Sequence, residues 1–132
     1  MNGWILYKNP VEESWETQKL VEEFEKQDVK IRVVNPNDVD IFVDREDRKS
    51  IIVGGKPRWL PDFVIPRTGS GTTYFIKAII RHLERLGVTL INGSHAIDTV
   101  KDKLYTQQIL AESNLPVPKT LLLKHPINLD WV

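Results

Sequence analysis

The chain has 132 residues, the length of one domain with one hydrophobic core, which excludes large multidomain chemistry. Its 18 basic residues balance 18 acidic ones, so no overall field favours nucleic acid or an anionic membrane. With no cysteine it has no disulfide, thiol nucleophile or zinc-thiolate site, and no apolar run is long enough to span a membrane. These features favour a folded, cytoplasmic protein.

The first half of the chain predicts a β-α-β opening. The apolar run at residues 4–7 is typical of a buried strand and ends at Asn9-Pro10. Residues 14–27 form the pattern of a helix that lies on a sheet. Its expected apolar stripe consists of Trp15, Leu20, Val21 and Phe24. β-branched residues at 30–34 predict the second strand, which stops at Asn35-Pro36.

The segment from 38 to 58 is less regular. Residues 41–43 and 51–53 are expected to pair as a hairpin across the charged run 44–49. Because that run mixes both signs, we interpret it as a solvated loop and not as a metal site. Residues 61–66 then predict a strand bounded by prolines.

The strongest helical pattern spans residues 72–86, with apolar residues at helical spacing and a stop at Gly87. Residues 88–91 predict a strand, and Asp98 or Thr99 can cap a helix that runs to about residue 113. Residues 119–123 predict a further strand. Alternating strands and helices indicate a small, doubly wound α/β fold with a mostly parallel sheet.

The loop at residues 65–73 is the most informative stretch for chemistry. Arg67, Thr68, Gly69 and Ser70 follow a predicted strand and precede a helix N-terminus, where backbone N–H groups and the helix dipole attract phosphate or carboxylate. The spacing fits neither the P-loop nor the dinucleotide pattern. A tight turn with Thr72 as the helix N-cap explains the same residues equally well.

Other reactive side chains carry no clear chemistry on their own. Asp102-Lys103 in the first turns of the last helix is ordinarily a solvated pair. His82 is expected on the polar side of its helix, and no spacing brings two histidines together as ligands or a serine into a triad. The tryptophans are expected in the core or at an interface.

Several segments of the second half form a recognisable set of motifs. Residues 62–69 read DFVIPRTG, 83–87 read LERLG, and 91–94 read INGS. Residues 102–104 read DKL, and residues 116–120 read PVPKT. Together these segments resemble the N-terminal part of RimK-type ATP-grasp ligases, the α-L-glutamate ligase family, over about residues 60–123. The DKL and PVPKT segments are typical of the ATP-grasp superfamily, and the Pro-Arg-x-Gly strand end is typical of the RimK branch.

The resemblance implies a Rossmann-like pre-ATP-grasp domain over residues 1–92, followed by a linker helix and the start of the ATP-grasp region over 93–132. It implies that Lys103 reaches nucleotide phosphates and that the loop of Arg67, Thr68, Gly69 and Ser70 faces the acceptor or phosphate side of the cleft. The implied reaction uses ATP and Mg²⁺ to activate a protein or peptide carboxylate as an acyl phosphate, which an amino acid such as glutamate then attacks.

The family's second phosphate-binding Lys, its Gly-rich loop and its Mg²⁺-holding residues would all lie beyond Val132. We therefore expect this chain alone to be inactive, to bind ATP weakly and to work with the missing ATP-grasp domain. The alternative is a noncatalytic assembly or regulatory module with the same fold, and a third interpretation is a flavodoxin-like anion sensor. The acceptor, the amino acid added and whether the chain forms a homo-oligomer stay open; neither nucleic acid nor membrane is expected as a partner.

Overall fold

The computed structural model describes residues 1–43, 45 and 51–126. The chain divides into two compact units, Met1–Ser94 and His95–Val132.

The first unit contains a four-stranded parallel sheet in the order β2-β1-β6-β7. Its strands are β1 (Asn2–Leu6), β2 (Lys30–Val34), β6 (Phe63–Pro66) and β7 (Thr89–Leu90). Every pair in this sheet is parallel, and β1 lies in the middle with β2 on one side and β6 on the other. The predicted α/β class with a mostly parallel sheet is therefore confirmed.

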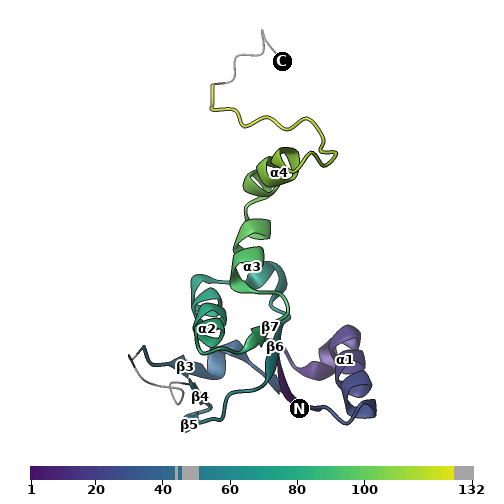
Figure 1. Ribbon diagram of the computed structural model, residues 1–132, viewed down its shortest axis with the longest axis vertical. Helices are drawn as coiled ribbons and strands as arrows, with labels where there is room; N and C mark the ends of the chain where they lie inside the picture. Colours follow the sequence, from purple (N-terminus) through teal and green to yellow (C-terminus); the bar gives the residue numbers. More distant parts are fainter. Residues whose placement is uncertain (44, 46–50, 127–132) are drawn as a thin grey trace. The chain divides into compact units, whose positions relative to one another are not determined.

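Two helices cover opposite faces of this sheet (Figure 1). On one face, α1 (Trp15–Lys26) packs through Phe24, whose ring centroid lies 5.4 Å from that of Phe63 on β6. On the other face lies α2 (Tyr74–Arg85). The prediction that Trp15 belongs to the buried stripe of α1 is wrong, because this side chain is 69% exposed in the first turn, while the buried residue of the helix is Thr17.

The core is assembled from both central strands and from α2. Leu6, Val64, Ile79, Ile80 and Leu83 are essentially inaccessible to solvent. Burial of such a side chain stabilises the fold by about 1.5–3 kcal/mol relative to leaving it exposed. The helix α2 contacts β7, β3 and the short helix η2 (Pro36–Asp38), so it is covered on more than one side.

A second, antiparallel sheet consists of β3 (Val39–Ile41), β4 (Ile51–Val53) and β5 (Lys56–Pro57). The predicted pairing and the strand at 51–53 are confirmed, but the first strand is 39–41 and not 41–43. Val39 is buried opposite Val53, whereas Phe42 and Val43 are exposed and follow the strand. Apart from Arg45, the charged run 44–49 lies outside the described residues.

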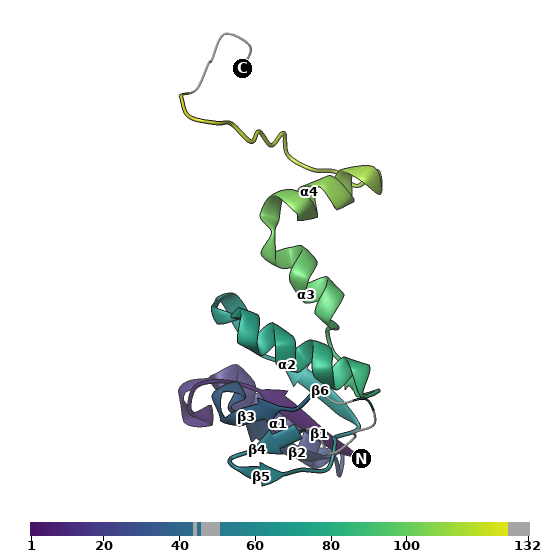
Figure 2. The ribbon, with the colours of Figure 1, turned by 90° about the vertical axis from the view of Figure 1, so that its left-hand side faces the viewer.

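The second unit is helical. α3 (Ser94–Lys101) starts at the end of the first unit, and α4 (Lys103–Glu112) follows after a bend (Figure 2). The predicted single helix is wrong, because Asp102 has an extended backbone (φ −96°, ψ 102°) and its side chain accepts a hydrogen bond from the Tyr105 N–H at 2.9 Å. The strand predicted at 119–123 is also absent, since no neighbouring strand is available there among the described residues.

Two short 3₁₀ helices, η1 (Val11–Glu13) and η3 (Gly69–Gly71), precede α1 and α2. In the described part of the chain, no helix combines the length and apolar character needed to cross a membrane.

Candidate functional site

Between β1 and β6, the direction in which the chain adds strands to the parallel sheet reverses. From β1 the chain crosses over through α1 to β2, and from β6 it crosses over through α2 to β7 on the other side. In open α/β sheets this switch point, outside the carboxyl ends of the strands, is where ligands bind. The residues that follow β1 and β6 are therefore the first candidates for a site.

Arg67 directly follows β6 and is held at this edge by its backbone, whose N–H donates to the Leu6 carbonyl at 2.9 Å. Its side chain is exposed. Side chains alternate along a strand, and Phe63 faces α1, so Arg67 lies on the α1 face as well. In agreement, the guanidinium lies close enough to Glu16 at the start of α1 to favour that carboxylate's charged form.

The rest of the predicted anion loop folds onto itself. Thr68 is buried, and its hydroxyl shares a 2.7 Å hydrogen bond with the Thr72 hydroxyl, which also contacts the Gly69 carbonyl at 2.7 Å. Gly69 has φ +53°, a conformation that glycine adopts without steric cost. These contacts stabilise the loop itself, and Ser70 contributes its backbone to η3.

The N-cap of α2 is Thr73, whose hydroxyl accepts from the Ile76 N–H at 3.4 Å. The prediction that Thr72 caps this helix is wrong, because Thr72 is the C-cap of η3 and its hydroxyl donates to the Gly69 carbonyl.

Lys8, which the sequence did not single out, lies at the same edge. It follows β1 by two positions, and its carbonyl accepts a hydrogen bond from the Asn35 side-chain amide at 3.1 Å. Its ammonium lies over Gly71: a Cβ built on Gly71 would be 2.5 Å from the Lys8 Nζ. No sequence motif signals this contact, because it joins residues that only the β1–β6 pairing brings together.

The N-terminus of α1 completes the edge. The Ser14 hydroxyl accepts from the Thr17 N–H at 3.1 Å and shares a 2.9 Å hydrogen bond with the buried Thr17 hydroxyl. The Glu16 carboxylate accepts from Ser14 Oγ at 3.1 Å. The pKa of Glu16 is lowered mainly by its own backbone N–H, then by the Ser14 hydroxyl and, more weakly, by the charge of Arg67. All three influences favour the charged form of Glu16.

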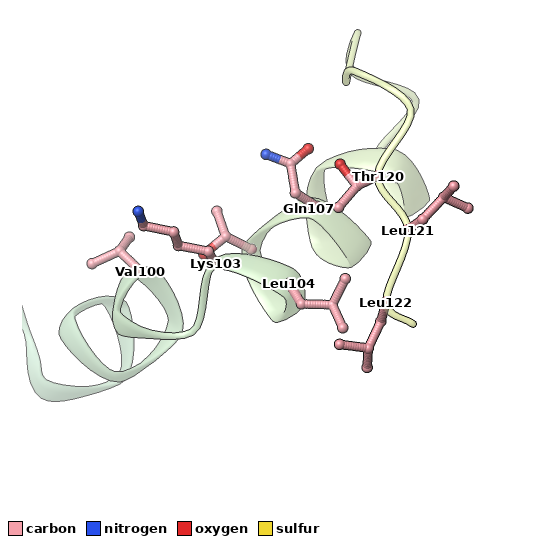
Figure 3. A pocket seen from close by; sticks show the side chains of 8 residues that line it. Val100, Lys103, Leu104, Gln107, Thr120, Leu121 and Leu122 are labelled. Atoms are coloured by element: carbon pink, nitrogen blue, oxygen red, sulfur yellow. The ribbon is translucent and has the colours of Figure 1, made fainter. Parts of the chain in front are cut away.

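Lys103 lies in the second unit, as the first residue of α4 after the N-cap Asp102. It lines a groove of about 450 Å³ between α4 and the extended segment that follows (Figure 3). Val100 and Lys103 are at one end, and Leu121 and Leu122 are at the other. The remaining lining residues are Leu104, Thr106, Gln107 and Thr120. Lys103 and Arg67 thus belong to different units.

The position of His82 differs from the one predicted from the sequence. It was expected on the polar side of its helix but is only 5% exposed, because α2 is covered on more than one side. Burial lowers the pKa of its imidazole, and the nearby charge of Arg85 adds to this effect. Within the described ranges, no three His, Asp or Glu side chains group as metal ligands.

The sequence of the chain matches a family model and several known proteins. A family model described as the RimK pre-ATP-grasp domain matches residues 1–97. The chain is 33% identical over 122 residues to a "Probable alpha-L-glutamate ligase" of Legionella pneumophila (strain Corby). The aligned region covers 92% of this chain and 40% of that protein. A protein of the same name from Marinomonas sp. is 33% identical over 123 residues, with the same two coverages.

A "Probable alpha-L-glutamate ligase 1" of Shewanella amazonensis is 31% identical over 116 residues, covering 88% of this chain and 38% of that protein. The chain therefore spans about 40% of the length of these relatives.

Among solved structures, the ATP-grasp ligase PsnB complexed with minimal precursor, Mg and ADP has a similar fold, with a TM-score of 0.62 at 17% identity. The match covers 91% of this chain and 46% of that one. Since the family model matches residues 1–97, which include the whole first unit and are more than half of the chain, the chain belongs to the RimK pre-ATP-grasp domain family.

Proposed function

We propose that this chain is the pre-ATP-grasp part, residues 1–92 with a linker from residue 93 onward, of a cytoplasmic carboxylate–amine ligase. The complete enzyme would add an amino acid such as glutamate to a protein or peptide carboxylate. The observation that carries the proposal is the RimK pre-ATP-grasp match over residues 1–97, which includes both loops at the switch point. Sequence similarity to proteins named as probable α-L-glutamate ligases supports the substrate class.

Within that reaction, ATP phosphorylates the acceptor carboxylate to an acyl phosphate and leaves as ADP. The amine of the incoming amino acid then attacks the acyl carbon, and inorganic phosphate leaves. Arg67 would hold a carboxylate at the edge of the sheet, since an exposed guanidinium can bind it through two parallel hydrogen bonds. Lys103 would contact nucleotide phosphate from the groove of the second unit.

Mg²⁺ would neutralise charge on the transferring phosphoryl group. Because the described residues contain no group of three metal-ligating side chains, its ligands would come from the ATP-grasp domain and not from this part of the chain. We also expect the 132-residue chain alone to bind ATP weakly, because most of the nucleotide-binding surface would belong to the ATP-grasp domain.

A chimera tests the proposal. The chain replaces the matched segment of the Legionella ligase, and glutamate-dependent ADP release and peptide mass are measured with a glutamate-ended acceptor peptide. We expect activity that Arg67→Ala reduces by about tenfold or more, because a charge-assisted hydrogen bond contributes about 1.5–3 kcal/mol. Arg32→Ala, an exposed arginine on β2, is the control and should leave the rate within twofold.

Two results would contradict the proposal. A folded chimera without glutamate-dependent turnover would favour the noncatalytic module. Tight binding of ATP by the 132-residue chain, measured by calorimetry, would mean that the nucleotide site does not depend on an ATP-grasp domain.

A further inference from the structure

The small antiparallel sheet of β3, β4 and β5 has one covered face and one open face. On the covered face α2 contacts β3, and three side chains are buried, those of Val39, Ile51 and Val53. Side chains alternate along a strand, so the residues between these point the opposite way. The pairing register sets Asp40, Ile52 and Pro57 side by side on the open face.

Two large aromatic side chains extend the open face at one end. The Arg58 N–H donates to the Ile51 carbonyl at 3.1 Å, so the pairing of β4 with β5 continues past Pro57. One further step along each outer strand reaches Phe42 and Trp59, which the register sets at the same level. Their side chains are 59% and 89% exposed. An exposed tryptophan grouped with other apolar side chains is typical of a binding surface.

The two edges of this sheet carry opposite charges. Asp38 and Asp40 are exposed on the β3 side. On the β5 side, Lys56 is exposed and Arg58 is half-buried. Neither β3 nor β5 has a second neighbouring strand among the described residues, so both edges border the open face without further cover from a sheet. An apolar face between an acidic and a basic border is complementary to a second copy of itself.

A twofold axis determines how two copies of such a face can meet. When the axis is parallel to β4, β3 of one copy lies over β5 of the other, and levels along the strands are preserved. Asp40 then lies within one residue's rise of the level of Lys56 in the other copy, and Phe42 lies over Trp59. An axis across the strands would instead set β3 over β3 and bring like charges together. The charges therefore favour the axis parallel to β4.

We propose that the open face of the β3-β4-β5 sheet is a self-association surface, on which a second copy of this chain packs about a twofold axis parallel to β4. Trp59 of each copy packs against Phe42 of the other, and Asp40 faces Lys56. Stable interfaces bury about 1,200–2,000 Å² in total, and these short strands offer less, so we expect a weak dimer with a Kd on the order of 0.1 mM. This association does not depend on the proposed ligase activity.

Sedimentation equilibrium of the 132-residue chain at concentrations from about 10 μM to 1 mM measures the association. Trp59→Ser should raise the Kd about tenfold or more, because a tryptophan at the centre of an interface commonly dominates its affinity. The matched control is Trp15→Ser, which removes a 69% exposed tryptophan from α1 and should change the Kd less than about twofold. Circular dichroism should show both variants folded, because both side chains are exposed in the monomer.

Charge exchange tests the direction of the axis. Asp40→Lys and Lys56→Asp should each raise the Kd about three- to tenfold, because each variant places like charges opposite one another in its own dimer. An equimolar mixture of the two variants should associate as tightly as the unaltered chain, because both contacts of the mixed pair again join opposite charges. Glu25→Lys makes the same change of charge on α1 and should leave the Kd within about twofold.

A chain that sediments as a monomer throughout this range would overturn the inference and assign the open face to a different partner. Equal losses for Trp59→Ser and Trp15→Ser would overturn it as well, because the association would then not be specific to this face. If Trp59→Ser dissociates the dimer but the mixed charge variants do not associate, the axis parallel to β4 is wrong. Each of these results leaves the glutamate-dependent turnover of the chimera unaffected, so the proposed function is tested separately.

Discussion

The two units of the chain differ in what holds their helices in place. In Met1–Ser94, α2 contributes five buried residues and lies against the parallel sheet, so tertiary packing fixes it. In α3 and α4 no residue is buried, and the best-defined local feature is the Asp102 cap. Isolated helices of this length are marginal in water without packing. The first unit therefore has its own core. The helices of the second unit instead expose apolar side chains, including Val100 and Tyr105.

Truncation of an apolar side chain should produce the largest difference between the units in the free energy of unfolding. Leu83→Ala, at a fully buried position of α2, is expected to lower the free energy of unfolding by about 2–5 kcal/mol. Leu104→Ala in α4 removes the same atoms from a half-buried position and should cost less than about 1 kcal/mol. Urea denaturation followed by tryptophan fluorescence measures both. Similar losses would show that α4 belongs to the same cooperative core as α2.

The N-caps offer a smaller and more local comparison. Ser14→Ala should lower the global stability by about 1–2 kcal/mol, because it removes the cap of α1 and leaves the buried Thr17 hydroxyl without that partner. Asp102→Ala removes an equivalent cap from α4 but should leave the global midpoint unchanged and speed amide exchange at Tyr105. Hydrogen exchange read by NMR distinguishes the two, and a global shift for Asp102→Ala would contradict the separation of the units.

The smallest expected effect concerns histidines. The pKa of buried His82 is lowered from 6.5, first by desolvation and then by Arg85, so the unfolded chain takes up a proton at a higher pH than the folded one. The free energy of unfolding should therefore fall as pH drops below 6.5, until the folded state also protonates. His82→Gln should flatten this part of the pH profile. Thermal melts between about pH 7.5 and 5 provide the measurement.

Much of the first unit could be predicted because its patterns are local. The strand at residues 30–34 was predicted with its observed bounds, and the helix of Tyr74–Arg85 follows from its apolar spacing. The errors arose where one side chain competes with a pattern. Asp102 accepts a hydrogen bond from Tyr105 and interrupts a run that is otherwise helical in spacing.

The candidate site was less predictable than the fold. Arg67 was singled out as a candidate because it stands in a recognisable strand-loop-helix context. Lys8 could not be found in this way, since its place beside Gly71 depends on the pairing of β1 with β6. The burial of His82 likewise depends on the elements that cover α2, which helical spacing alone does not reveal.

The position of β1 in the middle of the sheet has a consequence for synthesis. Asn2 donates its backbone N–H to the Asp62 carboxylate, 60 residues later, and Gly3 pairs with Phe63. While the ribosome is still adding the intervening residues, one hydrogen-bonding edge of an apolar strand has no partner. Such long-range parallel pairing is slow and exposes nascent chains to aggregation. The pairing of β1 with β6 can therefore form only after Phe63–Pro66 has emerged from the ribosome.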